Sequence, residues 1–318
     1  MEKIKIVAVV GPTASGKTGL AIELAKRFNG EVVSADSMQI YSELSIGTAK
    51  PSEEEKQGIL HHLMGFLSVN ENYSVADYVD DAKKAVVDIV SREKIPILCG
   101  GTGLYVDSFL QNTQFEEIQS DPTVHEKLLR LAEEEGKEQF FERLVRIDPK
   151  LAEKLHYNNI GRVLRALEVY ELTGKTMSEL QEESHSTPSP YDVCYIGVSF
   201  DDREKLYDRI EQRVEAMLNE GVLEEARFLF EHGNTTTAAQ AIGYKEFFPY
   251  FRGEISLSEA VEMLKKETRH YAKRQLTWFR RNKEIHWLYR DQYETPEELY
   301  SEAFTIVEHW RNYEEQNA

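Results

Sequence analysis

A glycine-rich segment near the start of the chain has the residue types that bind phosphate. It reads GPTASGKT, matches G-x-x-x-x-G-K-[ST], and lies between an apolar run at 4–10 and an amphipathic run at 17–28. In such a loop the backbone amides point inward, the lysine adds positive charge and the threonine hydroxyl binds magnesium. We therefore predict di- or triphosphate binding, with Thr18 as the Mg²⁺ ligand, by Gly11, Pro12, Thr13, Ala14, Ser15, Gly16, Lys17 and Thr18.

A carboxylate, Asp36, follows the next short apolar run, GEVVS at 30–34. Parallel sheets gather ligands at the carboxyl ends of their strands, so Asp36 is expected to face the phosphate loop. The residues alone leave three roles open for it: magnesium ligand, general base, or cap of a following helix. The run IPILC at 95–99 ends without an acid in Gly100-Gly101-Thr102, and Thr102 is expected to offer its hydroxyl to the site.

Apolar runs that alternate with helical patterns predict a parallel sheet covered on both faces. The stretch 73–92 has helical spacing with Ser74 as its cap, and strand character returns at 193–200. Between them, 116–192 is almost continuously charged and helical. The predicted fold is thus an α/β class, P-loop NTPase-like parallel sheet core, 1–115 and 193–318, with an inserted helical domain, 116–192.

Composition excludes several classes of protein. Among the 318 residues no run approaches 18 consecutive apolar positions, which argues against a membrane span, and the start of the chain lacks a secretory pattern. Two cysteines make no disulfide framework, the His61-His62 pair lacks a third metal ligand, and a cytoplasmic location is expected. The net charge of −18 conceals a basic stretch, 265–283, with eight Lys or Arg and one acid.

Seven motifs, in order, resemble the bacterial tRNA dimethylallyltransferases (tRNA isopentenyltransferases), and the similarity extends to about Trp287. They are GPTASGKT, SADSMQIY with IGTAKP, GGTGLY, GRVLRALEVYELTGKT, YDRIEQRVEAML, QAIGYKEF and TRHYAKRQLTWFRR. The resemblance implies that the loop holds the diphosphate of dimethylallyl diphosphate rather than ATP. The allyl group would pass to the exocyclic amine of the adenosine just 3′ of the anticodon, in tRNAs that read codons beginning with U.

The resemblance also assigns roles to residues. It implies Asp36 as the base that deprotonates the amine, and Lys17, Thr102 and Arg209 as further catalytic residues. Arg209 and Arg213 lie four apart on one helical face, and the resemblance points to Arg209 alone as a diphosphate contact. A monomer that needs Mg²⁺ is expected.

Binding of the tRNA is implied for five parts of the chain. The flipped adenosine would meet residues near Asp36, and the insertion would close over the anticodon stem-loop. Two positions depart from the family pattern, Asn159 and His125, and they weaken the assignments within the insertion. The implied tRNA contacts are Asp36, Ser37, Met38, Gln39, Thr102, Gly161, Arg162, Val163, Leu164, Arg165, Gln240, Ala241, Ile242, Gly243, Tyr244, Lys245, Lys273, Arg274 and Arg280.

Helical spacing in the basic stretch 265–283 predicts a basic stripe for the phosphate backbone of RNA. Its members are Lys266, Arg269, His270, Lys273, Thr277 and Arg280. Three alternatives remain: a P-loop small-molecule kinase, an adenylate isopentenyltransferase acting on free nucleotides, and a P-loop protein that only binds RNA. A kinase requires a nucleobase-binding segment, and we do not find one. An enzyme that acts on free nucleotides needs neither the helical insertion nor the basic stripe. A protein that only binds RNA would leave Asp36 without a role.

Overall fold

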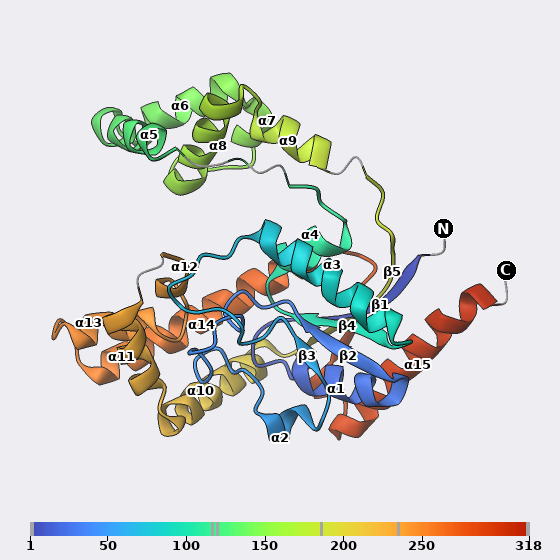
Figure 1. The fold of residues 1–318 in the computed structure, drawn as a ribbon. Helices are drawn as coiled ribbons and strands as arrows, with labels where there is room; N and C mark the ends of the chain where they lie inside the picture. Colours follow the sequence, from blue (N-terminus) through green and yellow to red (C-terminus); the bar gives the residue numbers. More distant parts are fainter. Residues whose placement is uncertain (1–2, 116–117, 119–120, 185–186, 234–235, 316–318) are drawn as a thin grey trace. The chain divides into compact units, whose positions relative to one another are not determined.

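The computed structural model describes residues 3–115, 118, 121–184, 187–233 and 236–315 (Figure 1). The chain divides into two compact units. One comprises Met1–Leu110 with Pro190–Ala318, and the other is Gln111–Ser189. The expected start of the insertion at residue 116 lies outside the described residues.

The larger unit is built on a six-stranded sheet in which every neighbouring pair of strands is parallel, as predicted. The strand order is β3-β2-β4-β1-β5-β6, so the strand before the phosphate loop is central. Its seven residues pair with β5 along their whole length, from Ile4 opposite Tyr191 to Val10 opposite Gly197. The strands are β1 (Ile4–Val10), β2 (Gly30–Ser34), β3 (His61–His62), β4 (Ile95–Gly100), β5 (Tyr191–Ser199) and β6 (His286–Tyr289).

Helices cover both faces of this sheet (Figure 1). Val7 and Val9 of β1 point to one face, where they pack with α1 (Lys17–Phe28) and α15 (Pro296–Glu315). Ile6, Ala8 and Val10 point to the other face, where they pack with α3 (Val75–Ser91) and α4 (Gly103–Leu110). This alternation along an apolar run is why both sides of β1 are buried.

In helix α3 the local sequence determines where the helix begins and which of its faces is buried. Ser74 accepts a hydrogen bond from the Asp77 amide, and the Asp77 carboxylate accepts one from the Ser74 amide, which forms a capping box. Its buried positions recur at three- and four-residue steps: Tyr78, Val79, Ala82, Val86 and Ile89. The predicted helix and its predicted cap are both confirmed.

A second helical layer belongs to the same unit and shares a core with the segment that follows β2. Ile40, Tyr41 and Leu44 of that segment pack with Val214 and Leu264 from two of the helices. The elements of this layer are α10 (Arg203–Glu220), α11 (Val222–His232), α12 (Thr236–Ala239), η1 (Lys245–Phe247), α13 (Phe248–Phe251) and α14 (Leu257–Phe279). Two short elements of the same unit lie outside this core, α2 (Glu53–Lys56) and η2 (Arg290–Gln292).

The smaller unit contains helices and no strand among its described residues. Phe140 and Leu144 lie at the centre of its core, against Val163 and Leu167. Asp148 begins one of the helices by accepting a hydrogen bond from the Leu151 amide. The helices are α5 (Pro122–Glu135), α6 (Lys137–Ile147), α7 (Pro149–Ala152), α8 (Ile160–Thr173) and α9 (Met177–Ser184).

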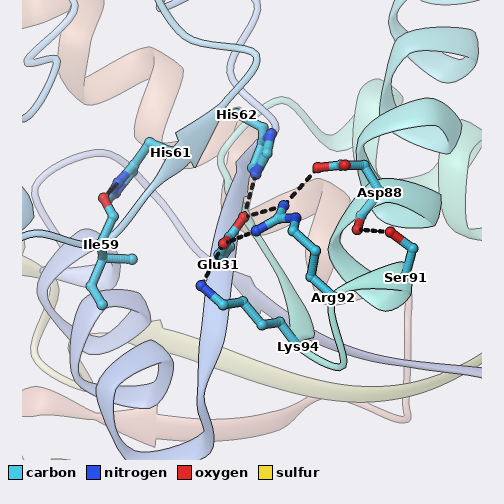
Figure 2. A network of polar contacts seen from close by, with 8 residues as sticks. All are labelled: Glu31, Ile59, His61, His62, Asp88, Ser91, Arg92 and Lys94. Atoms are coloured by element: carbon cyan, nitrogen blue, oxygen red, sulfur yellow. Dashed lines mark hydrogen bonds and ion pairs between the residues drawn. The ribbon is translucent and has the colours of Figure 1, made fainter.

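A buried carboxylate anchors the amino end of the sheet (Figure 2). Glu31 of β2 is only 2% exposed and binds Arg92 with both oxygens, Lys94 at 2.7 Å and His62 Nε2 at 2.7 Å. The hydrogen bonds from Arg92 hold the Glu31 pKa well below its usual range, and Lys94 and His62 add to this against the effect of burial. Glu31 therefore joins β2 and β3 to the turn that follows α3.

Candidate active site

The phosphate loop adopts the curled conformation that its glycines predict. Gly16 has φ +90°, in the left-handed region that favours glycine, and α1 begins at the next residue. Ala14 also has positive φ, +63°. Lys17 follows at the first position of α1, and its Nζ donates a hydrogen bond to the Pro12 carbonyl at 3.2 Å. The lysine thus bends back over the loop.

The segment that follows β2 is held to the turn that follows β4. The Ser37 amide donates to Thr102 Oγ1 at 3.0 Å, and the Thr102 amide donates to the Ala35 carbonyl at 3.1 Å. Asp36 Oδ1 accepts from the Met38 amide at 3.0 Å. Residues 37–40 form a turn and no helix, so the proposed role of Asp36 as a helix cap is wrong.

A cavity of about 210 Å³ joins these groups in the larger unit. Lys17 and Thr18 line it beside Asp36, so the phosphate loop and the carboxylate share one space. Of the residues predicted from the sequence, those that line it are Thr13, Lys17, Thr18, Asp36, Ser37, Met38, Gln39, Gln240, Ala241, Ile242 and Gly243.

Two arginines of α10 occupy different places. Arg213 lines the cavity, where burial lowers its pKa and the nearby Asp36 charge opposes that effect. Arg209 is exposed and donates from Nε to the Ala14 carbonyl at 3.3 Å. The resemblance had pointed to Arg209 alone. The signal that was missed is the position of Arg213 within the buried apolar stripe of α10, Ile210, Val214 and Met217.

The electrostatics of the cavity favour an anionic ligand. Burial lowers the Lys17 pKa, the charges of Cys99 and Asp36 raise it, and Arg213 lowers it again. Neither Lys17 nor Arg213 forms an ion pair with any residue that the structure describes. Two unpaired cations in a small enclosed space cost free energy unless an anion joins them.

The far wall of the cavity is fixed by a second carboxylate that the sequence did not reveal. Glu225 of α11 accepts hydrogen bonds from the Ile46 and Gly47 amides, at 2.9 and 3.0 Å, and from the Tyr244 hydroxyl at 2.8 Å. Tyr244 is fully buried, so it supports the predicted Gln240–Lys245 segment from within. That segment and the loop at 45–49 are thereby held together.

Helix α14 has two different faces. Thr268, Tyr271 and Gln275 line the cavity. The side chains of Lys273, Arg274 and Arg280 are exposed, with Lys266 and His270 beside them. Arg269 was predicted to belong to this stripe, but it forms an ion pair with Glu211 at 2.8 Å and is half-buried.

The residues predicted within the insertion lie on α8 of the smaller unit. Gly161 and Arg162 are exposed, whereas the side chains of Val163 and Leu164 are buried in the helical core. Arg165 donates to Glu168 at 3.1 Å. His125, one of the departures from the family pattern, has Nδ1 at 3.9 Å from the same carboxylate. Asn159 precedes the first residue of α8.

The side chains near the cavity determine which metal ions the site could bind. Within the described part of the chain, no group of three or more His, Cys, Asp or Glu side chains is arranged to hold a metal. Thr18 lies in the cavity beside Lys17. One hydroxyl fits a magnesium ion that is held mainly by ligand phosphates and water. Over the same residues, no helix is long and apolar enough to cross a membrane.

A glycine-rich loop that follows the central strand of a parallel sheet, beside a cavity lined by Lys17 and Arg213, is the arrangement typical of proteins that bind phosphorylated ligands. A family model described as IPP transferase matches residues 39–282. The tRNA dimethylallyltransferase of Acetivibrio thermocellus is 49% identical over 92% of this chain and 94% of its own length. That of Caldanaerobacter subterraneus is 48% identical over 96% and 98%. The chain belongs to the IPP transferase family, a family of enzymes, as its resemblance implied.

Solved structures agree with the assigned fold. The full-length tRNA isopentenylpyrophosphate transferase of Bacillus halodurans matches with a TM-score of 0.73 and 39% identity, over 98% of this chain and all of the other. A eukaryotic dimethylallyltransferase, in a structure described as acting on tRNA, matches with a TM-score of 0.75 and 34% identity. That match covers 90% of this chain and 73% of the eukaryotic one.

Proposed function

We propose that this protein transfers the dimethylallyl group from dimethylallyl diphosphate to a tRNA adenosine. The acceptor is the exocyclic amine of the adenosine just 3′ of the anticodon, in tRNAs that read codons beginning with U, and diphosphate is released. The observation that carries the proposal is that Lys17, Asp36 and Arg213 line one cavity. Cations for a leaving diphosphate and a carboxylate for an incoming amine are thus placed together.

The departing diphosphate requires stabilisation of its charge as the bond to carbon breaks. The loop amides at the start of α1, the Lys17 ammonium and the Arg213 guanidinium supply it within the cavity, and Arg209 adds charge at the Ala14 side of the loop. The Thr18 hydroxyl would hold a magnesium ion, which would supply further positive charge for the leaving diphosphate. The allyl donor carries no nucleobase, so the donor side of the site needs no nucleobase-binding segment, which favours the transferase over an ATP-dependent small-molecule kinase.

Asp36 acts on the acceptor as the general base. The amine nitrogen forms a bond to C1 of the allyl group, and the bond from C1 to the diphosphate oxygen breaks with its electron pair on oxygen. The amine proton passes to the Asp36 carboxylate. The hydrogen bond from the Met38 amide fixes one oxygen of that carboxylate, Oδ1, and leaves Oδ2 for the proton.

The tRNA meets several surfaces. The adenosine leaves the anticodon stem-loop to enter the cavity, which is lined by Ser37, Met38 and Gln39 and by residues 240–243. Thr102 holds the Ser37 amide. Lys273, Arg274 and Arg280 on the exposed face of α14 bind backbone phosphates. Arg162 and Arg165 of the helical unit bind the stem-loop. A cytoplasmic monomer suffices, because one chain supplies the loop, the base and the cavity.

The test measures transfer of radiolabelled dimethylallyl from its diphosphate, with magnesium present. Unmodified tRNA and AMP compete as acceptors, and a transcript with guanosine at the proposed position serves as the control. Label in the adenosine transcript alone is expected. Label in AMP alone would instead indicate an adenylate isopentenyltransferase, and label in neither acceptor would refute prenyl transfer.

A further inference from the structure

One side-chain amide connects the two halves of the proposed active site. Gln275 of α14 accepts a hydrogen bond at Oε1 from the Thr13 amide of the phosphate loop, at 2.8 Å. Its Nε2 donates to the Gly101 carbonyl, in the turn that follows β4, at 3.0 Å. The residue that follows Gly101 is Thr102, which holds the Ser37 amide beside Asp36. Gln275 thus spans from the diphosphate loop to the segment that carries the base.

The surroundings leave this amide little freedom. Gln275 is only 5% exposed, and a Cβ built on Gly101 would lie 2.1 Å from its Nε2. Glycine at 101 is therefore required for the approach. Tyr271, one turn earlier on α14, is a further neighbour: burial raises its pKa, and polar contacts with Thr102 and Gln275 oppose that effect. A buried amide with both ends bonded holds its partners at a fixed separation.

We propose that Gln275 is a positioning residue that sets the distance between the bound diphosphate and Asp36. The predicted effects on rate rest on the proposed function, and the mechanism proposed above gives Gln275 no role. Both polar atoms of the amide are bonded to the protein backbone. It acts through Thr13 on the loop and through Gly101 and Thr102 on the segment that bears Asp36.

A role in positioning predicts a particular kinetic pattern. Each loop still binds its own ligand when the connection is lost, so the KM values for allyl diphosphate and tRNA change little. The rate of the chemical step falls, because a displacement of about 1 Å between reacting groups costs on the order of 100-fold. We expect Gln275→Met, which removes both hydrogen bonds and keeps the volume, to lower kcat about 10- to 100-fold. The same change at the exposed Gln139 of α6 is the matched control.

A conservative variant separates this role from simple destabilisation. In Gln275→Glu one oxygen still accepts from Thr13, and the other faces the Gly101 carbonyl. The ionised carboxylate cannot donate to that carbonyl, whereas the protonated acid can. We expect kcat relative to wild type to be low at pH 8 and to recover as the pH falls towards 6, since burial favours the neutral acid. The charged groups that line the same cavity are Asp36, Lys17 and Arg213, whereas burial raises the pKa of the Tyr271 phenol and keeps it neutral between pH 6 and 8.

A measurement without substrate tests the connection itself. Amide hydrogen exchange at Thr13 is expected to accelerate at least 10-fold in Gln275→Met and to stay near the wild-type rate in Gln275→Glu, which keeps the acceptor. Unchanged exchange in Gln275→Met would overturn the proposal whether or not the wild type transfers prenyl groups. If the wild type transfers, an unchanged kcat in Gln275→Met, or a loss in Gln275→Glu that does not depend on pH, would also overturn it.

Discussion

Lys17 and Arg213 line the same cavity, and neither has an ion-pair partner among the described residues. Burial is the main cause that lowers the Lys17 pKa, and the Arg213 charge lowers it further, against Cys99 and Asp36. Two positive charges in one enclosed space become favourable together when an anion lies between them. A diphosphate brings charge of the required sign and size.

The two arginines of α10 provide the first test of that relationship. We expect Arg213→Gln to lower kcat roughly 100- to 1,000-fold, because it removes charge from the leaving group in the transition state. Arg209→Gln should lower it less than about 10-fold, since an exposed guanidinium interacts through solvent. Single-turnover rates with saturating substrates measure both effects. A larger loss of kcat in Arg209→Gln than in Arg213→Gln would show that the ligand binds on the Arg209 side of the loop, outside the cavity.

The second test concerns Asp36. Asp36→Asn keeps an oxygen to accept from the Met38 amide and removes the base, so the chemical step should slow about 100- to 10,000-fold. Inorganic diphosphate should bind within about threefold of the wild-type Kd, measured by calorimetry. Asp80→Asn, an exposed change on α3, is the control. A rate near that of the wild type would assign the base to another group.

The third test concerns the exposed face of α14. Lys273→Ala combined with Arg274→Ala should raise the KM for tRNA and reduce the steepness of its salt dependence, since fewer counterions are released on binding. The KM for allyl diphosphate should stay the same. Lys83→Ala with Lys84→Ala removes the same charge from α3. An identical salt slope in the two double variants would show that α14 does not bind the RNA backbone.

The fourth test concerns stability at the amino end of the sheet (Figure 2). The folded-state pKa of Glu31 is lowered, chiefly by Arg92, so its stabilising contribution is complete above the ordinary carboxyl pKa of about 4.3 and is lost as the pH falls below it. Glu31→Gln should lower the free energy of unfolding at pH 7 by about 2 kcal/mol, the size expected for hydrogen bonds to a charged group, and should reduce the loss of stability below pH 4.

Thermal unfolding at several pH values measures this difference. Glu53→Gln is the matched control, because Glu53 pairs with Lys56 while its own side chain is 90% exposed. If the two variants had the same Tm at pH 7, the Glu31 network would not contribute to stability. Activity should be retained at pH 7 in both variants, since Glu31 lies at the amino end of β2 and Asp36 follows its carboxyl end.

The local sequence pattern was sufficient to predict an element where the element is long and a motif or a capping residue marks its end. The phosphate motif predicted the start of α1 at Lys17, and Ser74 predicted the start of α3. The two edge strands were not predicted. Strand β3 has two residues and β6 has four, too few for a periodic signal, and each exists because it pairs with a neighbour, as Val32 with His61 and Ser199 with Tyr289.

In the candidate site, too, local sequence predicted some residues, and the others depend on tertiary packing. A contiguous motif identified Lys17 and Thr18, and the end of a strand identified Asp36. Glu225 and Gln275 act on loops far away in the chain, and their hydrogen bonds depend on tertiary packing that no local pattern encodes. Gln275 in addition lies between Arg274 and Leu276 in the basic stretch, where surface charge dominates the pattern. The contribution of Arg213 likewise depends on what α10 packs against.

Because helix α14 uses two of its faces, insertion or deletion of a residue within it should disrupt both. Each residue of an α-helix advances the side chains by about 100°, so a single deletion between Thr268 and Gln275 would rotate all that follows. The amide that spans the two loops would turn away from the cavity, and the exposed basic residues beyond it would move to other directions at the same time. We therefore expect natural length variation to avoid this helix and to occur in the turns at its ends.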